Sequence, residues 1–309
     1  MTDHEGRDST DTSEFDSFGP WVAQVERASQ VPPLYRDHPL DLERTELVLK
    51  VPRNIERRNA NPSMDLYDAL IIVDTEETTV LVRTEGAYTT RKVSHERLVA
   101  VTHAVILLDA RVTLYVEDEE PLVLHYNGSS ERVVTRLVDL LRRLRTERSA
   151  RGRFSVGSGA RSGEIALPTD ERDVGVLNSW RSLAGREPSI AAIAAHSSIV
   201  VAPTSGFVSR AAHRLHPMVL RAAVFAASTD ELHVVHRSDW LSRGRSTDLS
   251  HAHTVVFRDD GAIVHHRPHP RYEQVTVLTV GPRDGAVEID VPAGSGAVDA
   301  VTSALGQRA

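Results

Sequence analysis

The sequence contains no cysteine, almost no lysine and no long uninterrupted run of apolar residues. The absence of cysteine excludes disulfides, thiolate zinc sites, iron–sulfur clusters and a cysteine nucleophile. The two longest apolar stretches, 98–108 and 190–203, are both interrupted by polar residues, so we expect no transmembrane helix. The first residues lack the basic and apolar regions of a signal peptide. We therefore expect a cytoplasmic protein, with attachment to the periphery of a membrane left open.

The charge balance is acidic, with 43 Asp and Glu residues against 36 Lys and Arg residues and a net charge of −7. Nucleic-acid binding normally requires a basic surface, so we expect no nucleic-acid partner. The 309 residues are enough for about two domains, and an apolar fraction of 40% is ordinary for a globular chain. Neither a nucleophile elbow nor a P-loop is present, and we expect no cofactor.

Two stretches of low apolar content divide the chain. Residues 1–19 carry six acidic side chains and one arginine, which predicts a disordered acidic tail. Residues 149–171 are rich in Gly, Ser and Arg, which is typical of a flexible linker. The predicted domains are therefore 20–148 and 172–309.

The first predicted domain contains short strand-like runs followed by one amphipathic helix. Asn127 to Ser130 form a helix-capping sequence, and apolar residues then recur at helical spacing from Val134 to Leu144. A second, shorter helix is expected at 174–183. The predicted strands are 46–51, 67–74, 79–84, 89–93, 99–107, 112–116 and 122–126.

The second predicted domain repeats landmarks of the first in the same order. The segment 49–52 corresponds to 200–203, the segment 80–84 to 234–238, and the stripe of the first helix to Val298, Val301 and Leu305. We therefore expect a mainly β (α+β) protein with two similar domains. Each would have about seven antiparallel strands, forming a bent sheet or partly open barrel that a C-terminal α-helix closes.

This order of elements resembles a tandem of bacterial pleckstrin-homology-like (PH-like) domains, over roughly 45–145 and 195–306. The resemblance implies binding of lipid headgroups, peptides or proteins, and rarely catalysis. It leads us to expect a non-enzymatic binding or scaffold module that recognises a protein partner or an anionic membrane surface.

Four basic residues in and beside the loop after the first predicted strand are candidates for an anionic ligand: Lys50, Arg53, Arg57 and Arg58. Arginine forks match phosphate oxygens, and in lipid-binding PH domains a basic loop at this place contacts phosphates. Acidic residues in the same loop leave a solvated loop or a partner surface as the alternative.

Histidines concentrate in the second predicted domain, where nine of the fifteen lie between His213 and His269. His251 and His253 would share one face of a strand, and with His265 they form a candidate metal site. A metal-dependent enzyme is therefore the competing hypothesis, while the alternative for these histidines is the polar face of ordinary strands. His233 and His236 are three apart in a strand and should point to opposite faces.

Overall fold

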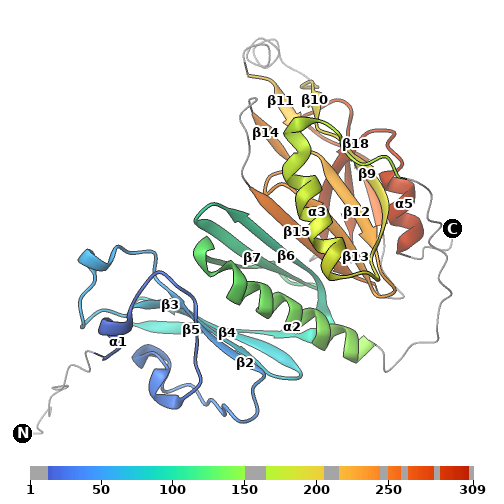
Figure 1. The fold of residues 1–309 in the computed structure, drawn as a ribbon. Helices are drawn as coiled ribbons and strands as arrows, with labels where there is room; N and C mark the ends of the chain where they lie inside the picture. The colour runs from blue at the N-terminus through green and yellow to red at the C-terminus, as the bar shows by residue number, and fades with distance from the viewer. Residues whose placement is uncertain are drawn as a thin grey trace, which may run out of the picture. The chain divides into compact units, whose positions relative to one another are not determined.

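The structure is a computed structural model, and it describes residues 13–149, 165–204, 216–243, 250–258, 264–281 and 286–305 (Figure 1). Within these ranges the chain is mainly β, with several antiparallel sheets, none of them closed into a barrel. It divides into two compact units. Unit 1 consists of Met1–His95 and Tyr126–Leu144, and unit 2 consists of Glu96–His125 and Arg145–Ala309. This division does not follow the predicted domain boundaries.

Unit 1 contains a five-stranded sheet in the order β1-β2-β3-β4-β5. Its strands β2 to β4 are rich in Val, Ile, Leu and Thr, and short turns join β3 to β4 and β4 to β5, which is why the sequence pattern located them. One side packs on a core that includes Phe18, Tyr35, Tyr67 and Leu70. The strands are β1 (Ala23–Gln24), β2 (Leu47–Pro52), β3 (Tyr67–Val73), β4 (Glu77–Thr84) and β5 (Ala87–Ser94).

Short helical turns complete unit 1. The helix α1 (Ser13–Ser17) lies inside the segment predicted to be a disordered tail, whereas residues 1–12 lie outside the described ranges. The 3₁₀ helices are η1 (Ala28–Gln30), η2 (Pro33–Tyr35), η3 (Arg57–Asn59), η4 (His95–Arg97), which crosses into unit 2, and η5 (Gly128–Ser130).

The predicted amphipathic helix is confirmed as α2 (Glu131–Ser149). The side chain of Asn127 accepts a hydrogen bond from the backbone N–H of Ser129 at 3.0 Å, so the predicted cap forms one turn ahead of the helix. The apolar stripe is buried at Val134, Leu137, Val138, Leu141 and Leu144. Burial of this stripe supplies most of the free energy that holds the helix in place.

Unit 2 is built around a seven-stranded sheet in the order β8-β7-β6-β15-β13-β12-β9. β6 lies between β7 and β15, so strands from both halves of the sequence share one sheet. The expectation of a separate seven-stranded sheet in each half is therefore not confirmed. The strands are β6 (Leu98–Ile106), β7 (Asp109–Val116), β8 (Leu122–Asn127), β9 (Ala191–His196), β12 (Ala223–Ala227), β13 (Glu231–His236) and β15 (His251–Phe257).

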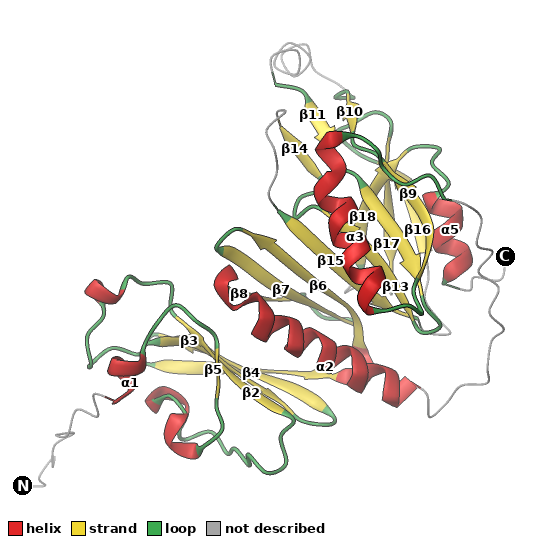
Figure 2. Ribbon diagram, viewed as in Figure 1, coloured by secondary structure: helices red, strands yellow, loops and turns green. Residues whose placement is uncertain are grey.

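The two faces of this sheet pack against different partners (Figure 2). The α3 face, which includes Val224 and Val235, packs on the helix α3 (Val174–Arg186), a helix that the sequence predicted at 174–183. The opposite face, which includes Phe225 and Val234, packs on the sheet β16-β17-β18 and on α5 (Ala297–Ala304). We call it the β16–β18 face. Its covering strands are β16 (Val264–Pro268), β17 (Val275–Val280) and β18 (Val287–Pro292).

A smaller three-stranded sheet, β10-β11-β14, completes unit 2 together with a 3₁₀ turn, η7 (Glu171–Asp173), directly before α3. The sheet packs on a core of Val201, Leu220 and Val275. Its strands are β10 (Ile199–Val201), β11 (Met218–Leu220) and β14 (Leu241–Arg243). Most of the predicted linker, at 150–164, lies outside the described ranges.

A search of the described helices for a membrane-spanning segment found none with sufficient length and apolar character.

Candidate functional site

Lys50, the first candidate for an anionic ligand, is directed into unit 1. Its side chain is only 8% exposed, and Nζ donates a hydrogen bond to the carbonyl of Gln30 at 3.2 Å. The ammonium also lies 4.6 Å from the centre of the Tyr67 ring, a cation–π contact. Burial lowers the pKa of Lys50, because removal from water disfavours the charged form. The ammonium group of Lys50 therefore contacts groups inside unit 1 and does not face solvent.

The three candidate arginines each contact their own chain. Arg53 donates to the carbonyl of Asp65 at 3.1 Å. Arg57 donates to the carbonyls of Phe18 and Asp16, and its guanidinium stacks 5.2 Å from the ring of Phe15. Arg58 forms an ion pair with Glu56 and is largely exposed. The structure does not direct these side chains to one common point, and an anionic ligand at this loop stays a prediction.

The three histidines proposed as metal ligands are not brought together. His251 and His253 alternate with the buried Ala252 along β15, so they share the α3 face as predicted. His265 is exposed on β16, whose neighbour Val264 packs in the core on the other side of the large sheet. His253 instead contacts His233, a histidine that the sequence placed among the strands without a role.

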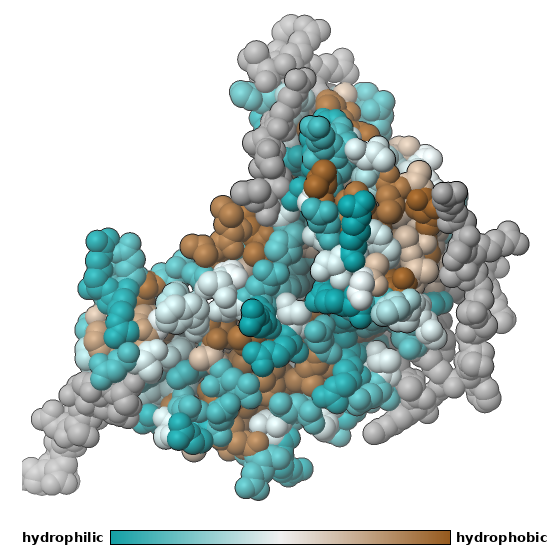
Figure 3. All heavy atoms as spheres, viewed as in Figure 1, coloured by the Kyte–Doolittle hydropathy of each residue, from teal (hydrophilic) through white to brown (hydrophobic). Residues whose placement is uncertain are grey.

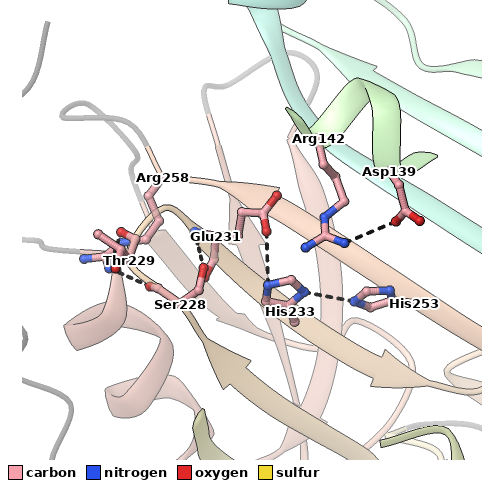
Figure 4. A network of polar contacts seen from close by, with 8 residues as sticks. All are labelled: Asp139, Arg142, Ser228, Thr229, Glu231, His233, His253 and Arg258. Atoms are coloured by element: carbon pink, nitrogen blue, oxygen red, sulfur yellow. Dashed lines mark hydrogen bonds and ion pairs between the residues drawn. The ribbon is translucent and has the colours of Figure 1, made fainter. Parts of the chain in front are cut away.

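A cluster of two carboxylates and one imidazole lies on the α3 face. Figure 4 shows two of its three side chains, Glu231 and His233, together with His253. We define the Glu–His cluster as Glu187, Glu231 and His233. One ligand atom from each of the three side chains lies within 4.8 Å of the other two. Glu231 Oε2 is 3.3 Å from His233 Nε2. Among the residues that the structure describes, this is the group that gathers enough acidic and imidazole ligands to suit a metal ion.

The strand and the turn before it position the cluster. Glu231 and His233 are two residues apart in β13, so the pleat places both on the α3 face. The turn ahead of β13 is tied by Arg258, which donates to the carbonyls of Ser228 and Thr229 at 3.1 and 3.0 Å. Glu187 is the C-cap of α3, and its N–H bonds to the carbonyl of Leu183 at 2.9 Å. Each of the three side chains therefore extends from a well-defined point of the backbone.

His233 is completely buried, and its two ring nitrogens have different surroundings. Nδ1 lies 3.1 Å from His253 Nε2. Nε2 points towards Glu231 and has no hydrogen-bond partner among the residues that the structure describes. In the next strand, His253 is paired in register with His103 of β6. Three imidazoles from three neighbouring strands therefore follow one another on the α3 face.

The histidine on the opposite side of β13 is fully satisfied. His236 Nδ1 lies 2.6 Å from the carbonyl of Arg237, and Nε2 lies 2.9 Å from the Thr254 hydroxyl. The ring stacks on Trp240 with 4.1 Å between centroids. Burial lowers the pKa of His236 to about 4, so the ring is neutral at neutral pH. The prediction that His233 and His236 point to opposite faces is confirmed by their separate contacts.

The turn between β6 and β7 exposes two leucines. Leu107 is 66% exposed and Leu108 is 65% exposed. The turn has two residues between Ile106 and Asp109, and Leu107 adopts a φ of 56°. Figure 3 shows hydrophobic surface where Figure 1 draws this end of the hairpin. The sequence pattern located both strands but gave the turn no role.

Comparison with known proteins adds no further constraint on these sites. No protein-family model, no curated protein and no solved structure matches the chain.

Proposed function

We propose that this chain is a non-enzymatic binding protein that inserts the tip of the β6–β7 hairpin into an apolar pocket of a protein partner. The observation that carries the proposal is the pair of exposed leucines at a tight turn. Exposed apolar residues scattered singly are ordinary, whereas two large neighbours at a protruding tip are typical of a contact surface.

The backbone conformation of the turn gives a second reason to assign the leucines a binding role. A two-residue hairpin turn with positive φ at its first position is normally filled by glycine, asparagine or aspartate. A residue with a Cβ atom in the left-handed region costs about 1–2 kcal/mol. Leu107 accepts this cost at φ 56° and stays 66% exposed. Burial against a partner would offset the strain.

The surrounding charges favour a protein over an anionic membrane. Asp109 follows the turn directly and is exposed. The nearest arginine along β7, Arg111, lies 3.4 Å from the Ser238 carbonyl and 3.9 Å from Asp239. The whole chain carries a net charge of −7, which repels an anionic surface. We therefore infer that the partner has a pocket with an apolar floor and a basic rim. Asp109 would contact the basic residues of that rim.

The PH-like resemblance also implied a binding role. The support for the present proposal, however, is the exposed hairpin tip and not that resemblance. Cytoplasmic location, the absence of a nucleic-acid partner and the two-domain PH-like organisation stay predictions.

Photo-crosslinking tests the proposal. A photoreactive amino acid at position 108 should crosslink to a discrete protein in cells that produce the chain. The same residue at position 118, in the β7–β8 turn where Asp118 also has a positive φ of 57°, serves as the matched control and should give no such product. The double variant Leu107→Gly/Leu108→Asn should abolish co-purification of that protein. It should also raise the free energy of unfolding by about 1 kcal/mol, because glycine relieves the strain.

Three outcomes would contradict the proposal. Crosslinks from position 108 that reach only lipid, together with co-sedimentation of the chain with anionic vesicles, would indicate a membrane surface. Crosslinks only to a second copy of the chain would indicate self-association. Co-purification that survives in the double variant would place the binding surface elsewhere.

A further inference from the structure

We propose that the Glu–His cluster binds one divalent transition-metal ion, Zn²⁺ or Mn²⁺, through Glu187, Glu231 and His233. This site is separate from the hairpin tip, and it does not include His265 or His251 as ligands. It lies entirely in unit 2, on β13 and at the end of α3.

The distances suit a metal ion of this size. Carboxylate oxygens and imidazole nitrogens bind Zn²⁺ at about 2.0–2.2 Å, so two ligands of one ion lie at most about 4.4 Å apart. The three ligand atoms already lie within 4.8 Å of one another, and Glu231 Oε2 and His233 Nε2 are 3.3 Å apart. The ligand atoms therefore exceed the largest separation within one coordination sphere by at most about 0.4 Å.

His233 provides an independent indication of a ligand. Its ring is 0% exposed, and within the described ranges Nε2 has no hydrogen-bond partner although it points into the cluster. A buried polar atom without a partner costs about 1–3 kcal/mol, so such an atom requires an explanation. His196 also buries its Nε2 without a hydrogen bond, but no pair of carboxylates converges on that ring among the described residues. The convergence of charge and an unused nitrogen distinguishes His233.

The neighbouring histidine would fix His233 in the state that a metal requires. Ligation needs a lone pair on Nε2, which places the ring proton on Nδ1. That N–H then donates to His253 Nε2 at 3.1 Å. Metal-bound histidines generally donate their second N–H in this way, which orients the ring and strengthens the metal bond. His253 is accordingly a positioning residue and not a ligand.

Charge and ligand type select the class of ion. Two carboxylates and a neutral imidazole carry a charge of −2, which a divalent cation neutralises. Imidazole disfavours Ca²⁺ and Mg²⁺, which prefer oxygen ligands, while the chain has no thiolate to select a softer metal. Glu187 is only half-buried, so an ion can reach the site from solvent.

Metal titration of the full chain tests the proposal. After chelator treatment, calorimetric titration with Zn²⁺ alone or Mn²⁺ alone should show one equivalent bound, and saturating metal should raise the melting temperature. Glu231→Gln and Glu187→Gln should each weaken binding at least tenfold. His253→Ala should weaken it by about 10–100-fold without removing a ligand. Co²⁺ bound in place of the native ion should give a visible d–d spectrum that changes in Glu231→Gln.

Matched variants separate the site from general charge effects and from misfolding. Asp230→Asn removes one negative charge next to Glu231, and His265→Ala removes an exposed histidine on β16; both should bind metal as the wild type does. Glu187→Gln alters only a half-buried side chain, so the test does not depend solely on substitutions inside the core. Less than a tenth of an equivalent bound, or equal affinity in Glu187→Gln, Glu231→Gln and wild type, would overturn the proposal.

Discussion

The α3 face and the β16–β18 face of the large sheet carry similar residues and use them differently. On the β16–β18 face, His236 bonds to the Thr254 hydroxyl at 2.9 Å, and that hydroxyl bonds to Thr102 at 2.8 Å. On the α3 face, the same three strands present His233, His253 and His103, with an unused nitrogen next to carboxylates. One row is a closed hydrogen-bond network, and the other is incomplete.

This difference separates structural histidines from candidate ligands. Residue type, burial and strand position are nearly the same for His233 and His236, which are 0% and 3% exposed. The distinction lies in whether every polar atom finds a partner within the chain. A complete hydrogen-bond network stabilises the fold. A network with an unsatisfied nitrogen next to two carboxylates can instead bind a ligand.

The largest expected effect is the loss of stability on substitution of His236. His236→Ala removes two hydrogen bonds and the stacking on Trp240, and should lower the free energy of unfolding by about 3–5 kcal/mol. His233→Ala in the absence of metal should cost less, about 1–3 kcal/mol, because one of its nitrogens makes no hydrogen bond to any described part of the chain. Urea denaturation with chelator present measures both. Equal losses would mean that the two faces do not differ as described.

The second expected effect is acid sensitivity of the β16–β18 face. Burial lowers the pKa of both His196 and His236 to about 4. The unfolded chain therefore takes up protons first, and stability is lost as the pH falls from about 6.5 to about 4. Asp290 on β18 acts in the opposite direction, because burial raises its pKa to about 6 and its contribution is lost as the pH rises through that value.

Urea unfolding across pH 7 to pH 4 should show the two histidines outweighing Asp290, with a net loss of a few kcal/mol in acid. Asp290→Asn should be more stable than the wild type at pH 7 and equal to it at pH 4, which isolates the opposing contribution. A wild-type stability that is flat over this range would show that the histidines are not neutral inside the fold.

The smallest expected effect is the loss of stability on substitution of the two threonines in the closed network. Thr254→Val leaves His236 Nε2 without its partner, and should cost about 1–3 kcal/mol. Thr102→Val should cost less than about 1 kcal/mol, since Thr254 still bonds to His236. The double variant should cost less than the two single costs combined. Additive losses in urea denaturation would indicate that the three side chains do not act as one network.

Local patterns predicted local structure well. Each predicted strand of the first half lies within about three residues of an observed one, and the cap at Asn127 and the stripe ending at Leu144 match α2. These features depend on residues close together in the sequence, where alternation and helical spacing are visible. The pairing of β6 with β15 joins residues about 150 positions apart, and no sequence period records such a contact.

The candidate sites were predicted less well for a related reason. The basic residues had a suitable composition, but contacts such as Lys50 with Gln30 depend on tertiary structure. The sequence analysis placed His233 in a strand but did not extend that strand back to Glu231, although the spacing of two would have predicted a shared face. Glu187 joins them only through the packing of α3, which the sequence does not reveal. Leu107 was assigned to the end of the predicted strand 99–107, so the sequence pattern did not identify 107 and 108 as the turn, where glycine or asparagine is usual.

The insertion of β6 between β7 and β15 has a consequence for how the chain is made. When β6 leaves the ribosome, its neighbour β15 has not been synthesised, because β15 lies about 150 residues later in the chain. At about 5–20 residues per second, that edge waits roughly 8–30 seconds for its neighbour. During this interval the nascent chain presents an open, largely apolar strand to its surroundings, and a message truncated before β15 would leave that strand exposed permanently.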